Sequence, residues 1–404
     1  MSLSSALVLI LLVGLVLLLF ATSVPKQAGR LLTILILGLI CTATSTLMYY
    51  IQPAPGSYMD LERITDEMHQ IQGGKFSQVA EAYSLNPLST IYIAFAAELN
   101  NVNILKFISA FVFVGSFFAL LYLEWYRHAI SSLALCITAV LCVALINLPL
   151  TVAGVRWGPA SALAILGAYL RIMYRRKVGW VFLIIATLLH FSSVFIVLMT
   201  VCALFMKRTL YKLFSILIVC YTFISYAVVQ VAASTGNSAM KLMLLKMNGY
   251  YAFGSDFTLF ASGLSQLVSF MKLFICISIY ILIFYIRGKN LMCKSIYVKY
   301  FTLLLLVCIG SIPTGTPFRR FVAIALYASF PLLGWLITYL LNSVHASKSC
   351  VVVNEDGGMG HASIQNKYIF YILFTLLITA ISLSIFYDWH SYTLMYLSTK
   401  QVYL

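Results

Sequence analysis

Six ionisable side chains in an otherwise apolar chain have the types and positions that could do chemistry: Asp60, Arg63, Arg156, His190, Arg319 and Arg320. Arginine presents a planar fork of donors that matches phosphate oxygens. A carboxylate can act as a base, and histidine exchanges protons near neutral pH. Because charged groups close to a bilayer are costly and seldom kept without a task, these residues predict one site for an anionic, lipid-linked substrate.

The arginines lie where apolar helices are expected to begin. Arg156 directly precedes Trp157, and Arg319 and Arg320 follow Pro313–Phe318. A helix N-terminus adds free amide donors and the positive end of the helix dipole, so each start predicts an anion clamp. The alternatives are an interfacial Arg156 that reaches the membrane surface, and a topological charge at Arg319 and Arg320.

His190 and the pair Asp60 and Arg63 each allow two interpretations. His190 interrupts the apolar run Val178–Met206, where it either packs in the core or donates to a phosphate and exchanges a proton. Asp60 and Arg63 share a face if their segment is helical, so they either pair at the surface or supply a base and an anion contact. No Asp-x-Asp, His-Glu-x-x-His or His/Cys cluster is present, and we expect neither a metal nor another cofactor.

The elements that must position these residues are membrane helices. The 404-residue chain is 62% hydrophobic and 9% charged, whereas soluble proteins carry about 25% charged residues. The first apolar run has no small-residue cleavage site after it, and we expect it to be retained as a helix. The net charge of +15 is distributed in short clusters between apolar runs, which argues against a nucleic-acid-binding domain. The nine cysteines lack Cys-x-x-Cys spacing, and we expect them to pack in apolar surroundings.

The apolar runs predict an all-α polytopic membrane bundle of about 12 transmembrane helices in a single domain, residues 1–404. Ten runs are long enough to span or nearly so: Leu3–Ala21, Leu31–Ile51, Ile104–Leu123, Ile130–Leu150, Gly158–Tyr174, Tyr211–Ala232, Leu264–Ile286, Tyr300–Ile312, Phe321–Leu341 and Tyr368–Phe386. Val178–Met206 has to be split near His190 to keep the basic residues on one side. Asn86–Asn103 is short with polar ends, which predicts a re-entrant or interfacial helix.

With that split, the main basic clusters face the cytoplasm: Lys26 and Arg30, Arg127, Arg171–Lys177, Lys207–Lys212, Arg287–Lys299, and Lys348 and Lys367. Residues 342–366 are then a cytoplasmic loop. Residues 52–86 and 233–263 are extracytoplasmic loops. All six candidate residues are expected on that outer side.

Three sequence elements, in order and spacing over roughly Tyr49 to Leu204, carry a resemblance to a known family. They are Gly56, Asp60 and Arg63 after the second helix, Arg156 followed by Ala160 and Ala162, and Leu188–Ser193 after a basic turn. The pattern resembles the EpsG/Wzy-type polysaccharide (O-antigen) polymerases, as does a further arginine at Arg319 or Arg320.

The resemblance implies a multi-pass protein of the bacterial inner membrane with a GT-C-like glycosyltransferase architecture and an active site that faces the periplasm. It implies that a growing glycan on undecaprenyl pyrophosphate is transferred to one repeat unit on the same carrier. Arg63, Arg156 and Arg319 or Arg320 then bind the pyrophosphate. His190 contacts phosphate or transfers a proton, and Asp60 is the base or supports an arginine. A chain-length regulator and a flippase are expected partners, together with the lipid bilayer and no nucleic acid.

Other functions fit much of the same pattern. An O-antigen ligase uses the same lipid-linked donor as a polymerase but transfers the glycan to a different acceptor. A flippase or transporter of lipid-linked sugars needs charges that line a path to both faces, whereas the candidate residues gather on one side. A membrane O-acetyltransferase needs a histidine that is reachable from the cytoplasm.

Overall fold

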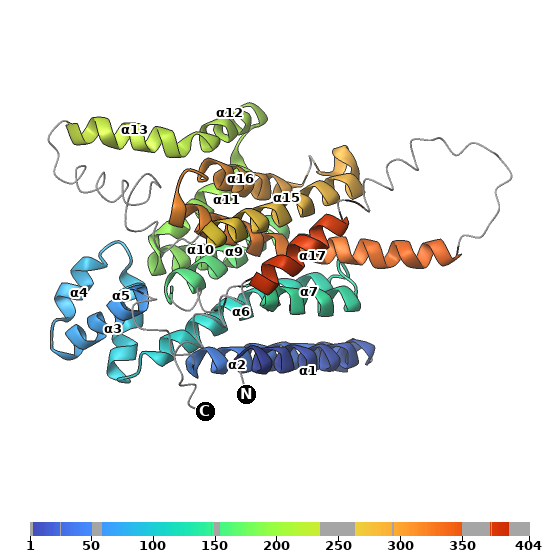
Figure 1. The fold of residues 1–404 in the computed structure, drawn as a ribbon, viewed down its shortest axis with the longest axis horizontal. Coiled ribbons are helices and arrows are strands. Elements are labelled where there is room, and N and C mark those ends of the chain that lie inside the picture. Colours follow the sequence, from blue (N-terminus) through green and yellow to red (C-terminus); the bar gives the residue numbers. More distant parts are fainter. Residues whose placement is uncertain are drawn as a thin grey trace. The chain divides into compact units, whose positions relative to one another are not determined.

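The computed structural model describes residues 3–24, 26–50, 59–146, 148, 154–234, 263–292, 295–349, 372 and 374–387. The regular elements within these ranges are all helices, as the sequence predicts (Figure 1). The chain divides into two compact units. Unit 1 comprises residues 1–197, 330–357 and 385–404, and unit 2 comprises residues 198–329 and 358–384.

Four helices among the described residues are long and apolar enough to cross a membrane: Ala28–Tyr50, Asn103–Tyr126, Gln266–Ile286 and Pro317–Asn342. A fifth span results if the bent pair Arg208–Val219 and Tyr221–Ser234 counts as one. Six further apolar helices have 10–17 residues, mostly too short for the roughly 20 residues that a span needs. Length and composition thus support a helical membrane protein with four to five spans in the described residues, fewer than the expected number.

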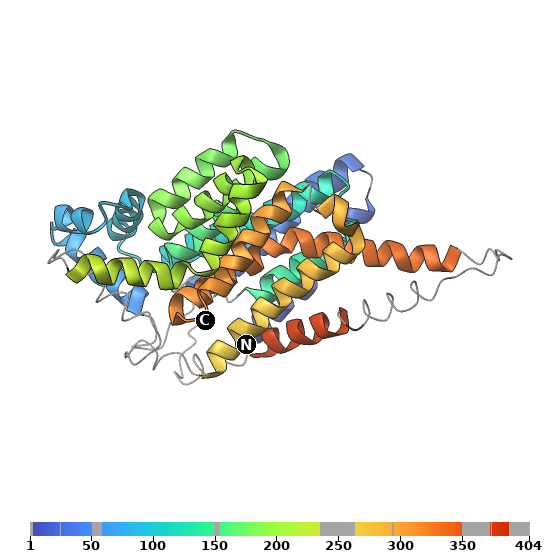
Figure 2. The ribbon, with the colours of Figure 1, turned by 90° about the horizontal axis from the view of Figure 1, so that it is seen from above.

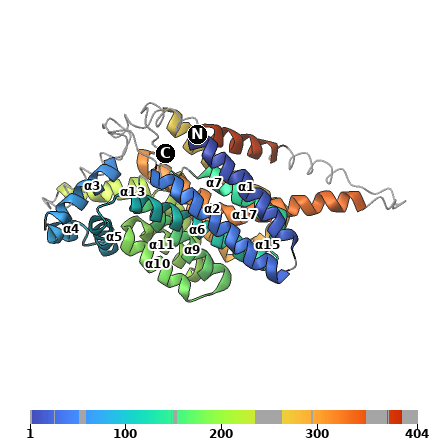
Figure 3. The same ribbon diagram turned by 90° about the horizontal axis from the view of Figure 1, so that it is seen from below.

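The helices of unit 1 form a packed succession: α1 (Leu3–Ser23), α2 (Lys26–Tyr50), α6 (Asn103–Tyr126), α7 (Ser132–Leu145), α9 (Trp157–Tyr174) and α10 (Val178–Leu189). Helix α1 packs on α2, α2 on α6, α6 on α9, and α9 on α10. Figure 3 shows α1 and α2 lying side by side. Helices α1, α2, α6, α7 and α10 bury one side against their neighbours and leave apolar side chains exposed on another, as expected for helices in lipid, whereas α9 exposes none of its residues.

Side-chain contacts fix the direction of these helices. The Asn101 side chain, just before α6, donates to the Tyr49 hydroxyl near the end of α2 at 2.7 Å. At the other end of the same two helices, the Arg30 guanidinium lies 4.4 Å from the centre of the Tyr126 ring. Helices α2 and α6 are therefore antiparallel. The Tyr174 hydroxyl at the end of α9 donates to Glu124 near the end of α6, so α9 runs parallel to α6.

Helices α9 and α10 form a hairpin whose backbones approach closely at two glycines. A Cβ built at Gly167 would lie 2.6 Å from the Gly179 carbonyl oxygen, and one at Gly179 would lie 2.5 Å from the Gly167 carbonyl oxygen. Small residues allow this approach between membrane helices. The turn between the helices includes Arg175, whose φ of 54° ends α9 in the left-handed conformation.

Three short helices lie beside this bundle in unit 1: α3 (Met59–Gln72), α4 (Phe76–Ala82) and α5 (Pro87–Glu98) (Figure 1). The segment expected as an extracytoplasmic loop, residues 52–86, thus contains α3 and α4 in its described part. Helix α5 starts with Pro87 at its first position, where a missing N–H costs nothing. At 12 residues it is about 18 Å long, too short to cross a bilayer, and its re-entrant or interfacial position stays a prediction.

The predicted break near His190 is confirmed. Helix α10 ends at Leu189, His190 has an extended backbone with φ −153° and ψ 116°, and a 3-10 turn η1 (Phe191–Ser193) leads into α11 (Val194–Phe205). The break divides the apolar run into two helices of 12 residues each.

Unit 2 contains α12 (Arg208–Val219), α13 (Tyr221–Ser234), α15 (Gly263–Met292), α16 (Ile296–Gly310) and the first part of α17 (Gly315–Ser349), which continues into unit 1 from residue 330. Helices α15 and α16 pack against each other (Figure 2). The Tyr297 hydroxyl of α16 donates to the Ala328 carbonyl of α17 at 2.6 Å. Helix α13 turns away from α12 by 70°.

Two of the expected loops lie mainly outside the described residues. Of residues 233–263, only 233, 234 and 263 are described, and of residues 342–366 only 342–349 are, as the end of α17. Six of the described cysteines are buried and have free thiols, which confirms the predicted buried packing for Cys41, Cys136, Cys142, Cys202, Cys276 and Cys308, whereas Cys220 is exposed and does not follow it.

Candidate functional site

Arg156 begins α9, as predicted. It is the N-cap residue, and its carbonyl accepts the amide of Ala160 at 3.2 Å. The residue is 7% exposed, so its charged side chain is largely removed from solvent. Its guanidinium carbon lies 4.4 Å from the centre of the Tyr83 ring, within the range of a cation–π contact.

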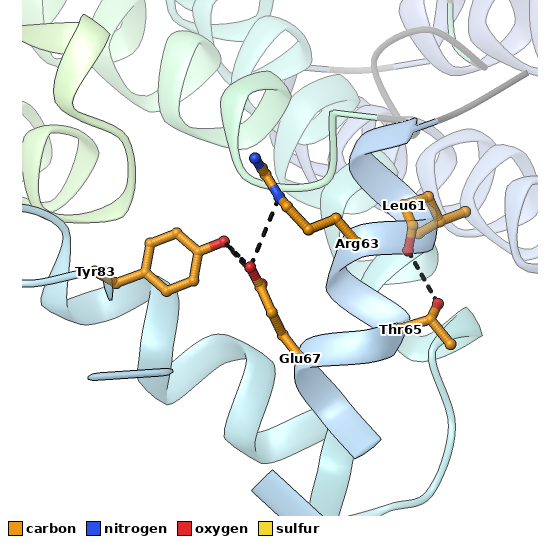
Figure 4. Close-up of polar contacts among 5 residues, drawn as sticks. All are labelled: Leu61, Arg63, Thr65, Glu67 and Tyr83. Atoms are coloured by element: carbon orange, nitrogen blue, oxygen red, sulfur yellow. Dashed lines mark hydrogen bonds and ion pairs between the residues drawn. The ribbon is translucent and has the colours of Figure 1, made fainter. Parts of the chain in front are cut away.

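Tyr83 continues this contact into α3 (Figure 4). Its hydroxyl is 2.7 Å from each carboxylate oxygen of Glu67, to which it donates. The same carboxylate lies 3.7 Å from Nε of Arg63, one turn earlier in α3. Arg63 and Arg156, two of the six predicted residues, therefore belong to one network that is joined through Tyr83 and Glu67.

The electrostatics of this network favour a protonated tyrosine. Burial, with a smaller contribution from the Glu67 carboxylate, raises the pKa of Tyr83 to about 12 although the two nearby guanidinium groups act in the opposite direction. The phenol is therefore a hydrogen-bond donor throughout the physiological range. It holds the carboxylate of Glu67 on one side and supports a cation on the other.

An apolar cluster holds the network in place. Leu61, Ile64 and Met68 recur along one face of α3 at helical spacing and are buried. They pack with residues from α4, α5 and the start of α6, and with Val155, which directly precedes Arg156. Tyr83 is a member of the same cluster. Burial of this apolar surface thus fixes α3 and α4 against the turn that carries Arg156.

His190 caps the turn η1. Its Nδ1 accepts the backbone N–H of Ser192 at 3.3 Å and lies 2.7 Å from the Ser192 hydroxyl. An Nδ1 that accepts from a backbone amide leaves the proton of the neutral ring on Nε2, as inferred from this hydrogen bond. His190 is partly buried. It therefore combines a structural role at Nδ1 with a donor at Nε2.

The hairpin of α9 and α10 places His190 at the same end of unit 1 as Arg156. Arg156 lies 11 residues before Gly167 and His190 lies 11 residues after Gly179, so the close approach of these two glycines places Arg156 and His190 at similar levels along the hairpin. Helix α5 reaches this end too, since the Ser89 hydroxyl donates to the Leu189 carbonyl at 2.5 Å. Arg63, Arg156 and His190 thus gather at one end.

The opposite end of unit 1 carries basic residues that the sequence predicts as cytoplasmic. The Arg30 guanidinium lies over the Tyr126 ring, and the Arg127 guanidinium carbon lies 3.9 Å from the centre of the Tyr174 ring. The turn between α9 and α10 adds the cluster Arg171–Lys177. The basic clusters of α2, α6 and α9 are therefore separated from Arg156 by the length of the helices.

A second arginine–tyrosine–glutamate arrangement lies at this basic end. Glu124, 3% exposed, accepts the Tyr174 hydroxyl at 2.8 Å and the Trp335 indole N–H at 2.7 Å. These bonds join α6, α9 and α17. Sequence reasoning missed Glu124, although a carboxylate inside an apolar run is itself a signal.

Besides His190, which lies at the same end, three predicted residues are not part of the described network. Asp60 lies in the first turn of α3, but its side chain is outside the described part, so its pairing or catalytic role stays a prediction. Arg319 and Arg320 lie in the first two turns of α17, as predicted, and are half-buried. They belong to unit 2, where the neighbouring Phe318 packs on Phe270 with ring centres 5.0 Å apart.

Sequence reasoning also missed Tyr83 and the particular role of Glu67. The available signal was the spacing of Arg63 and Glu67, which places both on one face of a helix. Comparison with protein families, with curated proteins and with solved structures found no match.

Proposed function

We propose that the chain is a membrane glycosyltransferase that polymerises repeat units carried on undecaprenyl pyrophosphate, to give an O-antigen, capsule or exopolysaccharide. The observation that supports this most is the meeting of Arg63 and Arg156 in one network, at the end of unit 1 that also carries His190. Basic clusters mark the cytoplasmic side of membrane proteins. The proposal therefore places the site on the periplasmic side of the bacterial inner membrane.

The proposed reaction needs charge neutralisation more than it needs a metal. A hydroxyl of the acceptor sugar attacks the anomeric carbon of the donor glycan, and the bond from that carbon to the phosphate oxygen breaks. The lipid pyrophosphate leaves with the electron pair, and the hydroxyl proton passes to a base. Arg156 and Arg63 stabilise the departing pyrophosphate, because guanidinium groups form charge-assisted bonds to phosphate oxygens. The positive end of the α9 helix dipole lies at the same place.

The other residues complete the proposed chemistry. His190 donates from Nε2 to a phosphate oxygen or transfers a proton, as an imidazole can. Asp60 is the proposed base for the acceptor hydroxyl or the support of an arginine. Arg319 or Arg320 is proposed as a further pyrophosphate-binding residue. Substitution of these arginines tests that assignment separately from the assignment of Arg156.

Deletion of the gene followed by separation of the surface glycan on a gel tests the function. Loss of a polymerase leaves single repeat units attached to the surface acceptor. Loss of a ligase leaves none attached while lipid-linked polymer accumulates, and loss of a flippase stops repeat units from reaching the outer face. Either of the last two results would replace the proposed function.

Substitutions then test the site. Arg156→Ala and Arg319→Ala should abolish the glycan ladder at normal protein abundance, and Arg156→Lys should impair it because an ammonium lacks the planar fork. Arg176→Ala is the matched control, since Arg176 is exposed at the basic end of unit 1. Normal ladders from both alanine variants at Arg156 and Arg319 would remove these arginines from the mechanism.

A further inference from the structure

We propose that Tyr83 is the positioning residue of the anion site: its ring holds the Arg156 guanidinium in place, and Glu67 fixes the ring through the phenol hydroxyl. This inference rests on the proposed function, because it assumes that Arg156 binds a diphosphate. Neither Tyr83 nor Glu67 is a catalytic residue in this assignment, since each acts through an arginine.

The geometry gives Tyr83 two separate contacts. The ring face meets the Arg156 guanidinium carbon at 4.4 Å, while the hydroxyl at the far edge meets both Glu67 oxygens at 2.7 Å. Two contacts in different directions define both the place and the orientation of the ring. The tyrosine is also buried in the apolar cluster of α3, α4 and α5, so little freedom remains for it.

An aromatic face suits the support of a cation that has to bind an anion. A carboxylate in the same place would pair with the fork of N–H donors and neutralise the charge. A ring attracts the cation through its quadrupole and does not require those donors as hydrogen bonds. Tyr83 therefore positions Arg156 without itself occupying any of its N–H donors.

Glu67 completes the arrangement at a distance from the anion. Its carboxylate is engaged by the Tyr83 hydroxyl and faces Arg63, whose side chain is 52% exposed. The Tyr83 hydroxyl and Arg63 both reach this carboxylate (Figure 4), while the tyrosine ring contacts Arg156. Without the hydroxyl bond, the carboxylate would be free to turn toward the nearest guanidinium and compete with a phosphate ligand.

The test is binding of farnesyl diphosphate to the purified full-length chain in nanodiscs of neutral phosphatidylcholine, measured by calorimetry. Tyr83→Leu removes the aromatic face and should raise Kd about 5- to 30-fold, the range expected for a partly to fully desolvated cation–π contact. Tyr83→Phe keeps the ring but releases the Glu67 carboxylate, so it should raise Kd by less than Tyr83→Leu does. If Tyr83→Leu does not fold, Tyr83→Met refills the volume with a flexible apolar side chain and serves the same purpose.

A double-mutant cycle separates positioning from general damage. In an Arg156→Ala background, Tyr83→Leu should cause no further loss of affinity, because its effect acts through Arg156. Tyr174→Leu, at the basic end of unit 1, removes the ring beneath Arg127 and should lower the melting temperature without changing Kd.

The outcomes distinguish the two proposals. Unchanged affinity in Arg156→Ala would refute the anion site itself, and with it the proposed function. Weaker binding in Arg156→Ala together with wild-type affinity in Tyr83→Leu, or fully additive losses in the cycle, would refute only the positioning role.

Discussion

A methyl group added at Gly179 should force α9 and α10 apart and displace the end of the hairpin that carries Arg156 and His190. The new Cβ would lie 2.5 Å from the Gly167 carbonyl oxygen and 2.9 Å from the Arg171 amide nitrogen. Both are backbone atoms, so no side chain can rotate away, and the helices have to separate. Overpacking of this kind costs about 1–3 kcal/mol. Alanine returns about 0.5–1 kcal/mol through its higher helix propensity, which leaves a net loss of stability.

Gly38→Ala provides the matched control. Gly38 also lies inside a helix, α2, but a Cβ there meets nothing within 4 Å. The same chemical change should therefore stabilise this variant by about 0.5–1 kcal/mol. The two variants together separate the helix propensity of alanine from the clash between α9 and α10.

The buried thiols provide the assay. Heating in detergent with a dye that fluoresces on reaction with cysteine reports unfolding, because six described cysteines are buried in the folded chain. We expect a lower melting temperature for Gly179→Ala, and an equal or higher one for Gly38→Ala. Farnesyl diphosphate binding should weaken in Gly179→Ala as well, since the hairpin sets the place of Arg156. A Gly179→Ala melting temperature at or above that of the unchanged protein would refute the close approach of the two backbones.

Three further predictions concern contacts elsewhere. Tyr174→Phe removes one of the two described donors to buried Glu124 and should destabilise the chain by about 1.5–3 kcal/mol in the same thermal assay, the usual value of a hydrogen bond to a charged group. Because the folded pKa of Tyr83 is raised to about 12, its contribution to stability is complete below about pH 10, its unfolded pKa, and is lost as the pH rises toward 12. Tyr83→Phe should flatten this alkaline loss, and an unchanged profile would contradict the assignment. Gly310→Ala would place a Cβ 2.5 Å from the Ile218 carbonyl oxygen and should lower the melting temperature, whereas no change would contradict the packing of α12 on α16.

The sequence was sufficient where a local pattern decides the structure. The charge pattern required a break near His190, and the chain breaks there. Pro87 and the polar residues that end its segment predicted a short helix, and α5 is one. Arg156 was predicted at a helix start because apolar residues follow it without interruption, and it is the N-cap of α9.

The sequence was insufficient where contacts between distant segments decide. Tyr83 stands in a polar stretch with no sign that its ring meets a residue 73 positions later. That contact depends on the apolar cluster that joins α3, α4 and α5 to Val155. The expected number of spans is not confirmed in the described residues either, because a run of apolar residues does not reveal where a helix ends. The run that begins at Ile130 gives a helix of only 14 residues.

The two arginine–tyrosine–glutamate arrangements of unit 1 show how the same contacts can have different purposes. At the basic end, Glu124 is 3% exposed and accepts two donors, so water and ligands are excluded and the bonds join three helices. In the other arrangement Arg156 and Tyr83 are also buried, but the Glu67 side chain is 14% exposed and that of its partner Arg63 is 52% exposed. Complete burial increases the contribution of a structural contact to stability, whereas a binding site has to remain accessible to its ligand. Loss of the tyrosine should therefore lower mainly stability at the basic end and mainly affinity beside Arg156, and the same phenotype at both ends would contradict this distinction.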